Sequence, residues 1–145
     1  MMHDLIPMLI STGLGTLVGL ERSAGGKPAG LRTHVLVCLG STMFVLTAAH
    51  AWRTIGGPNL DPTRVIHGVV TGVGFLGAGA ILQHRGNVFG LTTAASIWIV
   101  AAIGVAVGVH AYALASAGAV LALIVLEVFR WAERKYLPGP QGEPR

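Results

Sequence analysis

Long uncharged and mostly apolar stretches alternate with short charged segments along this chain. Counted between successive Asp, Glu, Lys or Arg residues, the uncharged stretches are 5–20, 33–52, 65–84 and 86–126. The hydrocarbon core of a bilayer is roughly 30 Å thick and requires about 20 helical residues. The first three stretches hold 16, 20 and 20 residues and suit one crossing each, whereas the fourth holds 41 and suits two, divided by a turn near 108–112. The pattern predicts an all-α, polytopic membrane bundle of about five transmembrane helices.

The distribution of Lys and Arg predicts the orientation of this bundle. With five crossings, eight of the ten Lys and Arg residues fall on one side, and only Arg53 and Arg64 fall on the other. Because the cytoplasmic side of a membrane protein carries the excess of Lys and Arg, we expect the amino terminus outside and the carboxyl terminus inside. The expected organisation is a transmembrane domain over 1–136 followed by a flexible, Pro-rich cytoplasmic tail over 137–145.

Composition agrees with this assignment and excludes several classes of function. Charged residues make up 11% of the chain against roughly 25% in soluble proteins, hydrophobic residues make up 52%, and the mean hydropathy is +0.67. The isoelectric point near 10 follows from the cations expected on the cytoplasmic side. Nucleic-acid binding would need a basic soluble face with interleaved aromatic residues, and the sequence does not show one. We therefore expect the lipid bilayer as the surroundings of this chain.

The sequence offers little for catalysis. It shows no Ser–His–Asp arrangement and no paired carboxylates, and no two histidines have the spacing of metal ligands on a helix. The segment 72–77 matches G-x-G-x-x-G, but it lies within an apolar stretch and lacks the strand and the following acid of a dinucleotide site. We therefore expect no enzyme activity and no cofactor; whether a metal binds stays open.

Glycines are abundant and recur at helical spacing. Small residues allow close approach of helices in a membrane, where lipid supplies no hydrophobic drive between them. The alternative is a glycine-lined path or a broken helix at a binding site. Their concentration in the third predicted helix favours a central place for that helix. The glycines expected at helix contacts are Gly15, Gly19, Gly68, Gly72, Gly74, Gly77, Gly79, Gly104 and Gly108.

Two acids stand out by position. Glu21 ends the first predicted helix, where a negative charge opposes the helix dipole. It either forms a structural ion pair with a nearby cation, such as Arg22 or Arg32, or belongs to a site for a cation or a partner. Asp61 precedes Pro62 and fits the N-cap of the third helix, although it could also contact an external cation or pair with Arg64.

The cytoplasmic face is the favoured site. Thr92 and Thr93 are expected to begin the fourth helix on this side, at the level of Glu21 and Arg32. Cys38 lies within the second helix, where a lone cysteine is usually a small packed residue. No site is expected at the charged end of the last helix.

Five ordered segments together resemble the MgtC/SapB family. They are GLER (19–22), PAGLRTH (28–34), DPTR (61–64), GVGFLGAG (72–79) and GLTTAASIW (90–98). The resemblance implies a bacterial inner-membrane protein associated with adaptation to low magnesium and with the membrane potential or the F-type ATP synthase. It places Glu21, Arg22, Arg32, Cys38, Asp61 and Arg64 at motif positions expected to matter for function. Longer members carry a soluble cytoplasmic domain after the helices, so roles that depend on that domain are not expected of these residues.

Three functional hypotheses follow. The first is a regulatory membrane protein that acts through helix contacts with a partner, such as the ATP synthase, or as a homo-oligomer. The second is a small cation channel or transporter in which Glu21 and Asp61 meet cations on opposite faces. The predicted membrane stretches contain no acid near their middle, which disfavours a proton relay. The third is a purely structural assembly protein, in which glycine substitutions would matter more than changes at Glu21 or Arg32.

Overall fold

The structure is a computed structural model that describes residues 2–55, 61, 63–84 and 87–136. The expected flexible tail, 137–145, lies outside the described residues. In chain order the elements are α1 (Met2–Ala24), α2 (Leu31–Ile55), α3 (Thr63–Gly79), β1 (Leu82–His84), β2 (Asn87–Phe89), α4 (Leu91–Gly108), α5 (Tyr112–Ile124), the π-helical turn η1 (Val125–Phe129) and α6 (Arg130–Tyr136).

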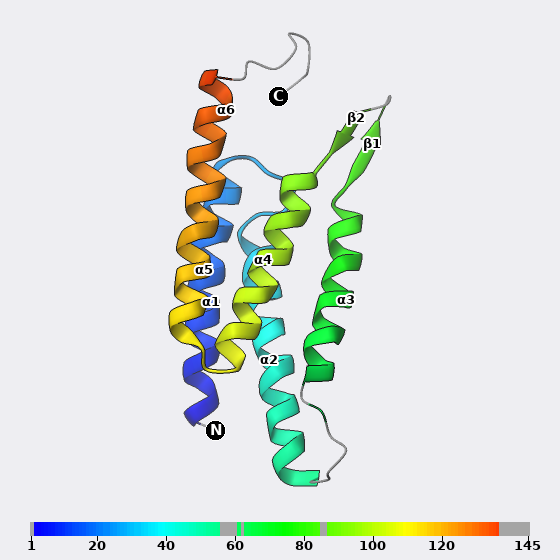
Figure 1. Cartoon of the computed structure of the whole chain (residues 1–145), viewed down its shortest axis with the longest axis vertical. Helices are drawn as coiled ribbons and strands as arrows, with labels where there is room; N and C mark the ends of the chain where they lie inside the picture. Colours follow the sequence, from blue (N-terminus) through cyan, green and yellow to red (C-terminus); the bar gives the residue numbers. More distant parts are fainter. Residues whose placement is uncertain (1, 56–60, 62, 85–86, 137–145) are drawn as a thin grey trace.

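The helices run alternately up and down, and α5, η1 and α6 continue one another as a single rod (Figure 1). The rod is therefore the fifth helical segment of the described chain, and the two ends of the described chain lie at opposite ends of the bundle. Four of these helices, α1, α2, α4 and the rod over Tyr112–Glu133, are long and apolar enough to span a membrane. The prediction of an all-α membrane bundle is confirmed; which end faces the cytoplasm stays a prediction.

The division of the last apolar stretch into two helices falls where the sequence predicted it. α4 ends at Gly108 and α5 begins at Tyr112. Between them His110 adopts a positive φ of 61°, an uncommon conformation for a residue other than glycine. The amides of this turn close it by donating to the last carbonyls of α4, from His110 to Val107 and from Ala111 to Ala106. A tight turn therefore joins α4 directly to α5.

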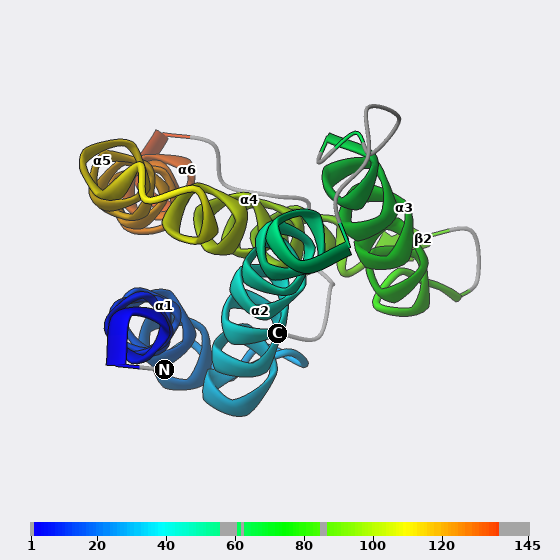
Figure 2. The same ribbon diagram turned by 90° about the horizontal axis from the view of Figure 1, so that it is seen from below.

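α4 is the central helix of the bundle. It packs against α1, α2, α3 and α5, whereas α3 lies at one edge against α2 and α4 (Figure 2). The expectation that the third helix is central is therefore wrong. The reason lies in the apolar pattern: α4 is apolar around its whole circumference and half of it is buried, but α3 has only Val69, Val73 and Gly77 buried.

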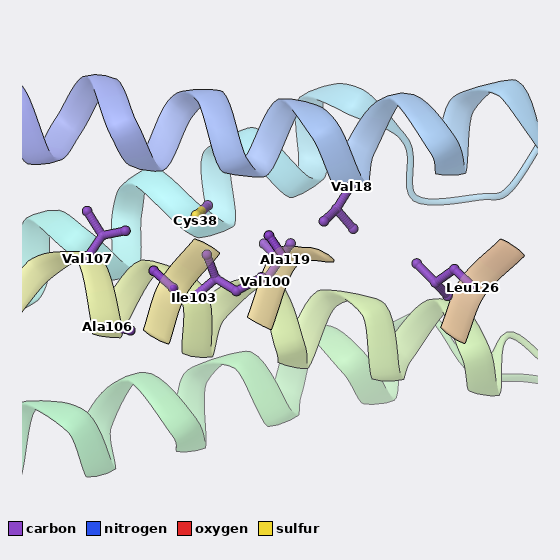
Figure 3. Close-up of a cluster of buried hydrophobic side chains, with 9 residues drawn as sticks. Val18, Cys38, Val100, Ile103, Ala106, Val107, Ala119 and Leu126 are labelled. Atoms are coloured by element: carbon purple, nitrogen blue, oxygen red, sulfur yellow. The ribbon is translucent and has the colours of Figure 1, made fainter. Parts of the chain in front are cut away.

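A hydrophobic cluster joins α1, α2, α4 and the α5 rod. Figure 3 shows its side chains converging between these helices. Because lipid tails are as apolar as the side chains, close packing rather than exclusion from water holds such a cluster together. Cys38 is fully buried here, as expected of a packed thiol. The cluster consists of Val18, Cys38, Val100, Ile103, Ala106, Val107, Ala115, Ala119 and Leu126.

Four of the glycines expected at helix contacts lie where helices approach closely. A methyl group on Gly15 would come within 2.9 Å of the Cys38 Cβ, and one on Gly19 within 2.8 Å of the Leu31 Cα. These two glycines bring α1 against α2. On α4, Gly104 and Gly108 meet α2 in the same way, and their added methyl groups would overlap with atoms of that helix.

The glycines of α3 behave differently. A methyl group on Gly68, Gly72, Gly74 or Gly79 would meet no atom within 4 Å, so the helix contacts expected at these positions are not found among the residues that the structure describes. Gly77 faces Ala94 of α4, where an added methyl group would have an ordinary contact distance of 3.6 Å. The sequence could not distinguish a glycine face turned toward the bundle from one turned away from it. α3 thus exposes much of its glycine surface.

A β-hairpin replaces the short inner loop expected between the third and fourth helices. Leu82 pairs with Phe89, and His84 pairs with Asn87, in antiparallel register. Gly90 follows β2 with a φ of 89°, and a methyl group there would overlap with the Ala80 carbonyl oxygen. Only glycine fits both the conformation and the space, and it allows the chain to turn directly into α4.

Candidate functional site

The sequence-predicted site residues divide between the two ends of the bundle. The end where α1 finishes and α2 and α4 begin is called here the Glu21 end, and the opposite end, where α3 begins, is the Asp61 end (Figure 1). The Glu21 end holds Glu21, Arg22, Arg32, Thr92 and Thr93. Asp61 and Arg64 lie at the Asp61 end, and Cys38 lies within the hydrophobic cluster between the two ends.

Glu21 forms the centre of an ion-pair network. The Arg22 guanidinium binds its carboxylate through two nitrogens, with Nε bonded to Oε2 and Nη2 lying 2.6 Å from Oε1. The Arg130 Nη1 lies 3.5 Å from the same Oε1, and the Arg130 Nη2 binds both oxygens of Glu127 at 2.6 and 2.7 Å. The side chains of Glu21 and Arg22 are only 6% and 2% exposed. Among the two alternatives for Glu21, the structure shows the ion pair.

This network connects the first helix with the last. Arg130 begins α6, directly after the π-helical turn that carries Glu127. Gly25 makes room for it, because a methyl group on Gly25 would lie 2.8 Å from the Arg130 Nη1. A pair that bridges two helices in a poorly solvated place is expensive to break from one side, since the remaining charge loses its partner. The network therefore holds the α5 rod against the end of α1.

A second polar cluster lies beside it, between α2 and α4. The His34 Nδ1 donates to the Gly30 carbonyl at 2.9 Å, and the Nε2 lies 3.0 Å from the Ser96 Oγ. The Ser96 Oγ also lies 2.8 Å from the Thr93 carbonyl oxygen. With neutral His34 protonated on Nδ1, the single hydroxyl proton of Ser96 serves one of these two acceptors at a time. All three side chains are buried, so the cluster fixes the register of α2 against α4.

The remaining predicted residues of the Glu21 end are less constrained. Arg32 and Thr92 are exposed, and no hydrogen bond or ion pair joins Arg32 to another of the described residues. Nearby, the Ser23 hydroxyl accepts the Leu31 amide at 2.7 Å and so satisfies the beginning of α2. The face predicted from the sequence thus combines a closed, charge-neutralised interior with an exposed cation.

At the Asp61 end, Asp61 does what the sequence predicted for the start of a helix. Its Oδ1 accepts the Thr63 amide at 2.9 Å and the Thr63 hydroxyl at 2.7 Å. These hydrogen bonds, with a smaller contribution from the positive charge of Arg64, hold the pKa of the Asp61 carboxyl below its ordinary value. The carboxylate is ionised and exposed, and Arg64 is exposed next to it.

Across the described part of the chain, no three His, Cys, Asp or Glu side chains gather in a group that could hold a metal ion. The two acids singled out for cations lie at opposite ends of the bundle, and one of them is already neutralised by arginines. The described residues therefore do not form a ready metal centre.

An apolar cleft lies between α2 and α3. It encloses about 680 Å³ and is lined almost wholly by apolar and small residues. Gly68 and Gly72 of α3 form part of its wall, together with Gly40 of α2, and a methyl group on any of the three would meet no described atom within 4 Å. Its lining residues are Leu36, Val37, Gly40, Ser41, Phe44, Val65, Gly68, Val69, Gly72, Val73 and Leu76.

Sequence reasoning missed several residues of these clusters. Arg130 and Glu127 were expected in a solvated helix end without a site, but Arg130 reaches Glu21 across the bundle. His34 was not among the predicted site residues, yet it is fully buried against Ser96. Both contacts join residues distant in sequence, and no local signal pointed to the Arg130 contact, whereas polar residues in the segments 28–34 and 90–98 hinted at the contact of His34 with Ser96.

Comparison with known proteins places the chain in a family. The profile of the MgtC family matches residues 8–135, which is most of the chain. The protein belongs to the MgtC family. The predicted family membership is thus confirmed, and the protein is a membrane protein.

The family relatives include proteins from several bacteria. The chain is 49% identical to YhiD of Escherichia coli strain K12, named as a candidate magnesium transporter, over 115 residues that cover 77% of this chain and 54% of YhiD. It is 40% identical to SrpB of Synechococcus elongatus, with 88% of this chain and 75% of SrpB covered. Protein MgtC of Salmonella typhimurium is 35% identical to the chain, with 97% of this chain and 60% of that protein covered. The chain thus spans little more than half the length of YhiD. No solved structure matches it.

Proposed function

We propose that this protein is a bacterial inner-membrane regulator in magnesium homeostasis that acts through contact of its helices with a membrane partner. The proposed link to magnesium rests on the family relatives, one of which is named as a magnesium transporter. The F-type ATP synthase is the partner that the family resemblance suggests, and a second copy of the chain is the alternative.

One observation carries the contact mechanism: α3 exposes glycines at which an added methyl group would meet no atom of the described residues within 4 Å. Gly68 and Gly72 are one helical turn apart and line the same apolar cleft. In a membrane, small residues at this spacing allow another helix to approach its neighbour's backbone closely. Since packing among the described helices does not use them, contact with a helix of another protein would account for their presence.

The ion-pair network also favours contact over transport. A transported divalent cation needs oxygen ligands that are able to leave their other partners. The Glu21 carboxylate is held by Arg22 and Arg130, and these cations would repel an approaching metal ion. A channel or transporter remains the alternative function, favoured by the exposed, ionised carboxylate of Asp61 at the other end.

The test is complementation at limiting magnesium in a bacterium that lacks its own member of the family. Gly72→Leu fills the cleft, and Gly13→Leu is the matched control, because a methyl group at either position meets no atom within 4 Å. Wild type and Gly13→Leu are expected to support growth, whereas Gly72→Leu, present in the membrane at the same amount, is not. Equal growth with both variants would contradict the contact mechanism.

A further inference from the structure

A second groove, between α1 and α2 at the Glu21 end, differs from the cleft in carrying a charge. It encloses about 370 Å³. Thr16 of α1 and Leu31, Val35 and Leu36 of α2 form its mostly apolar walls, and Arg32, in the first turn of α2, also lines it. The Thr16 hydroxyl donates to the Thr12 carbonyl at 2.8 Å, so it is satisfied within its own helix and requires nothing from an occupant.

Arg32 lacks a counter-charge. No acidic side chain pairs with it among the described residues, and Glu21, the acid that ends the neighbouring helix, is already bound by Arg22 and Arg130. Arg32 also lies in the first turn of α2, where the helix dipole is positive and disfavours a cation. Both effects leave a net attraction for an anion at this end of the groove.

The position of the groove in the membrane indicates which anion can contact both its apolar walls and Arg32. α2 is apolar enough to span the membrane, so its first turn lies where the hydrocarbon region gives way to the headgroups. Leu36 is 67% exposed and leaves the groove open to lipid along its length. An acyl chain fits the apolar walls, and a phosphate carried on the same molecule meets the guanidinium, which binds phosphate oxygens through two nitrogens.

From this charge complementarity we propose that the α1–α2 groove binds one anionic phospholipid, with an acyl chain against Thr16, Val35 and Leu36 and the phosphate bound by Arg32. The site is separate from the contact at Gly68 and Gly72, although Leu36 lines both cavities. The failure of one proposal therefore leaves the other standing.

Native mass spectrometry of the full chain in detergent tests this site. The protein receives equal amounts of phosphatidylglycerol and phosphatidylcholine with identical acyl chains, and the ratio of the two one-lipid complexes is measured. Wild type is expected to prefer phosphatidylglycerol by about fivefold, the effect of one cation near a membrane surface. Arg32→Gln is expected to lose this preference, and Arg32→Lys, which keeps the charge, to retain most of it.

Two further variants separate the groove from diffuse attraction to positive charge. Lys27→Gln removes an exposed cation that lies in the loop before α2 and does not line the groove, and it is expected to keep the preference. Thr16→Phe fills the groove without changing charge and is expected to lower the amount of both complexes. Equal binding of the two lipids to wild type, a preference that survives Arg32→Gln, or an equal loss in Lys27→Gln would each overturn the proposal.

Discussion

The contact between α2 and α4 at Gly104 allows a quantitative test of the packing. We consider the substitution Gly104→Ala, which adds one methyl group. That group would lie 2.9 Å from the Ser41 Cβ and 3.0 Å from the Cys38 carbonyl carbon, and it would overlap with the Cys38 carbonyl oxygen. The obstacle is backbone, so no flexible side chain can move aside, and the two helices must separate.

The expected cost has two parts. Forcing an extra methyl group into a packed contact costs about 1–3 kcal/mol, and the rigid backbone at this position favours the upper part of that range. Separation of the helices also weakens the hydrogen bond from the Thr42 hydroxyl to the Gly104 carbonyl, now 2.7 Å, which is worth about 0.6 kcal/mol in a membrane. Together these effects predict a loss of about 3 kcal/mol in the free energy of unfolding.

Cys38 supplies the assay. It is the single cysteine of the chain and is fully buried, so a thiol-reactive dye labels it only when the bundle opens. If the protein recloses faster than it reacts, the labelling rate follows the equilibrium population of the open form. A loss of about 3 kcal/mol then raises the labelling rate about a hundredfold at the same detergent concentration.

Gly40→Ala is the matched control, because a methyl group on Gly40 of α2 meets no atom within 4 Å. Its labelling rate is expected to stay within about twofold of wild type, since substitutions away from close contacts rarely change stability much. If Cys38 is labelled as slowly in Gly104→Ala as in Gly40→Ala, the result would contradict the close packing of α2 against α4 at Gly104.

Three further predictions concern other parts of the molecule. Glu21→Gln leaves the buried Arg22 without a counter-charge and is expected to lower stability by about 3 kcal/mol, measured by Cys38 labelling; a rate like wild type would contradict the ion-pair network. The hydrogen bonds from Thr63 stabilise ionised Asp61, so their contribution is present above the ordinary carboxyl pKa and is lost as pH falls through the lowered pKa. Protection of the amides at the start of α3, taken relative to their intrinsic exchange rate at each pH, is therefore expected to fall over that acidic range in wild type but not in Asp61→Asn. Gly90→Ala is expected to raise amide exchange in the hairpin and the first turn of α4, and unchanged protection would argue against the positive φ.

Much of the fold could be predicted from the sequence because a membrane imposes a simple length rule. The apolar stretches marked the helices, and the turn at 108–112 followed from dividing a stretch too long for one crossing. What the length rule could not supply was the arrangement of the helices. α3 was placed at the centre because of its glycines, but glycine content says only that a face permits close approach, not which neighbour occupies it.

The site was predicted only in part, for a similar reason. Charge and helix-end position identified Glu21 and Asp61, and local sequence predicted the cap that Asp61 provides. Arg22 was among the expected partners of Glu21 because it is its neighbour in sequence, whereas Arg130 lies more than a hundred residues away and needs the three-dimensional arrangement. The contact of His34 with Ser96 likewise depends on the register between α2 and α4, which no local pattern encodes.

Magnesium flux in liposomes tests most directly the proposal that the protein regulates rather than transports. The full chain is reconstituted in vesicles that contain a magnesium-sensitive dye, slow labelling of Cys38 establishes that it is folded, and Asp61→Asn is measured in parallel. Our account predicts that wild type, Asp61→Asn and protein-free vesicles admit magnesium at the same rate. A wild-type flux above that of protein-free vesicles, reduced by Asp61→Asn, would contradict it and establish a transporter.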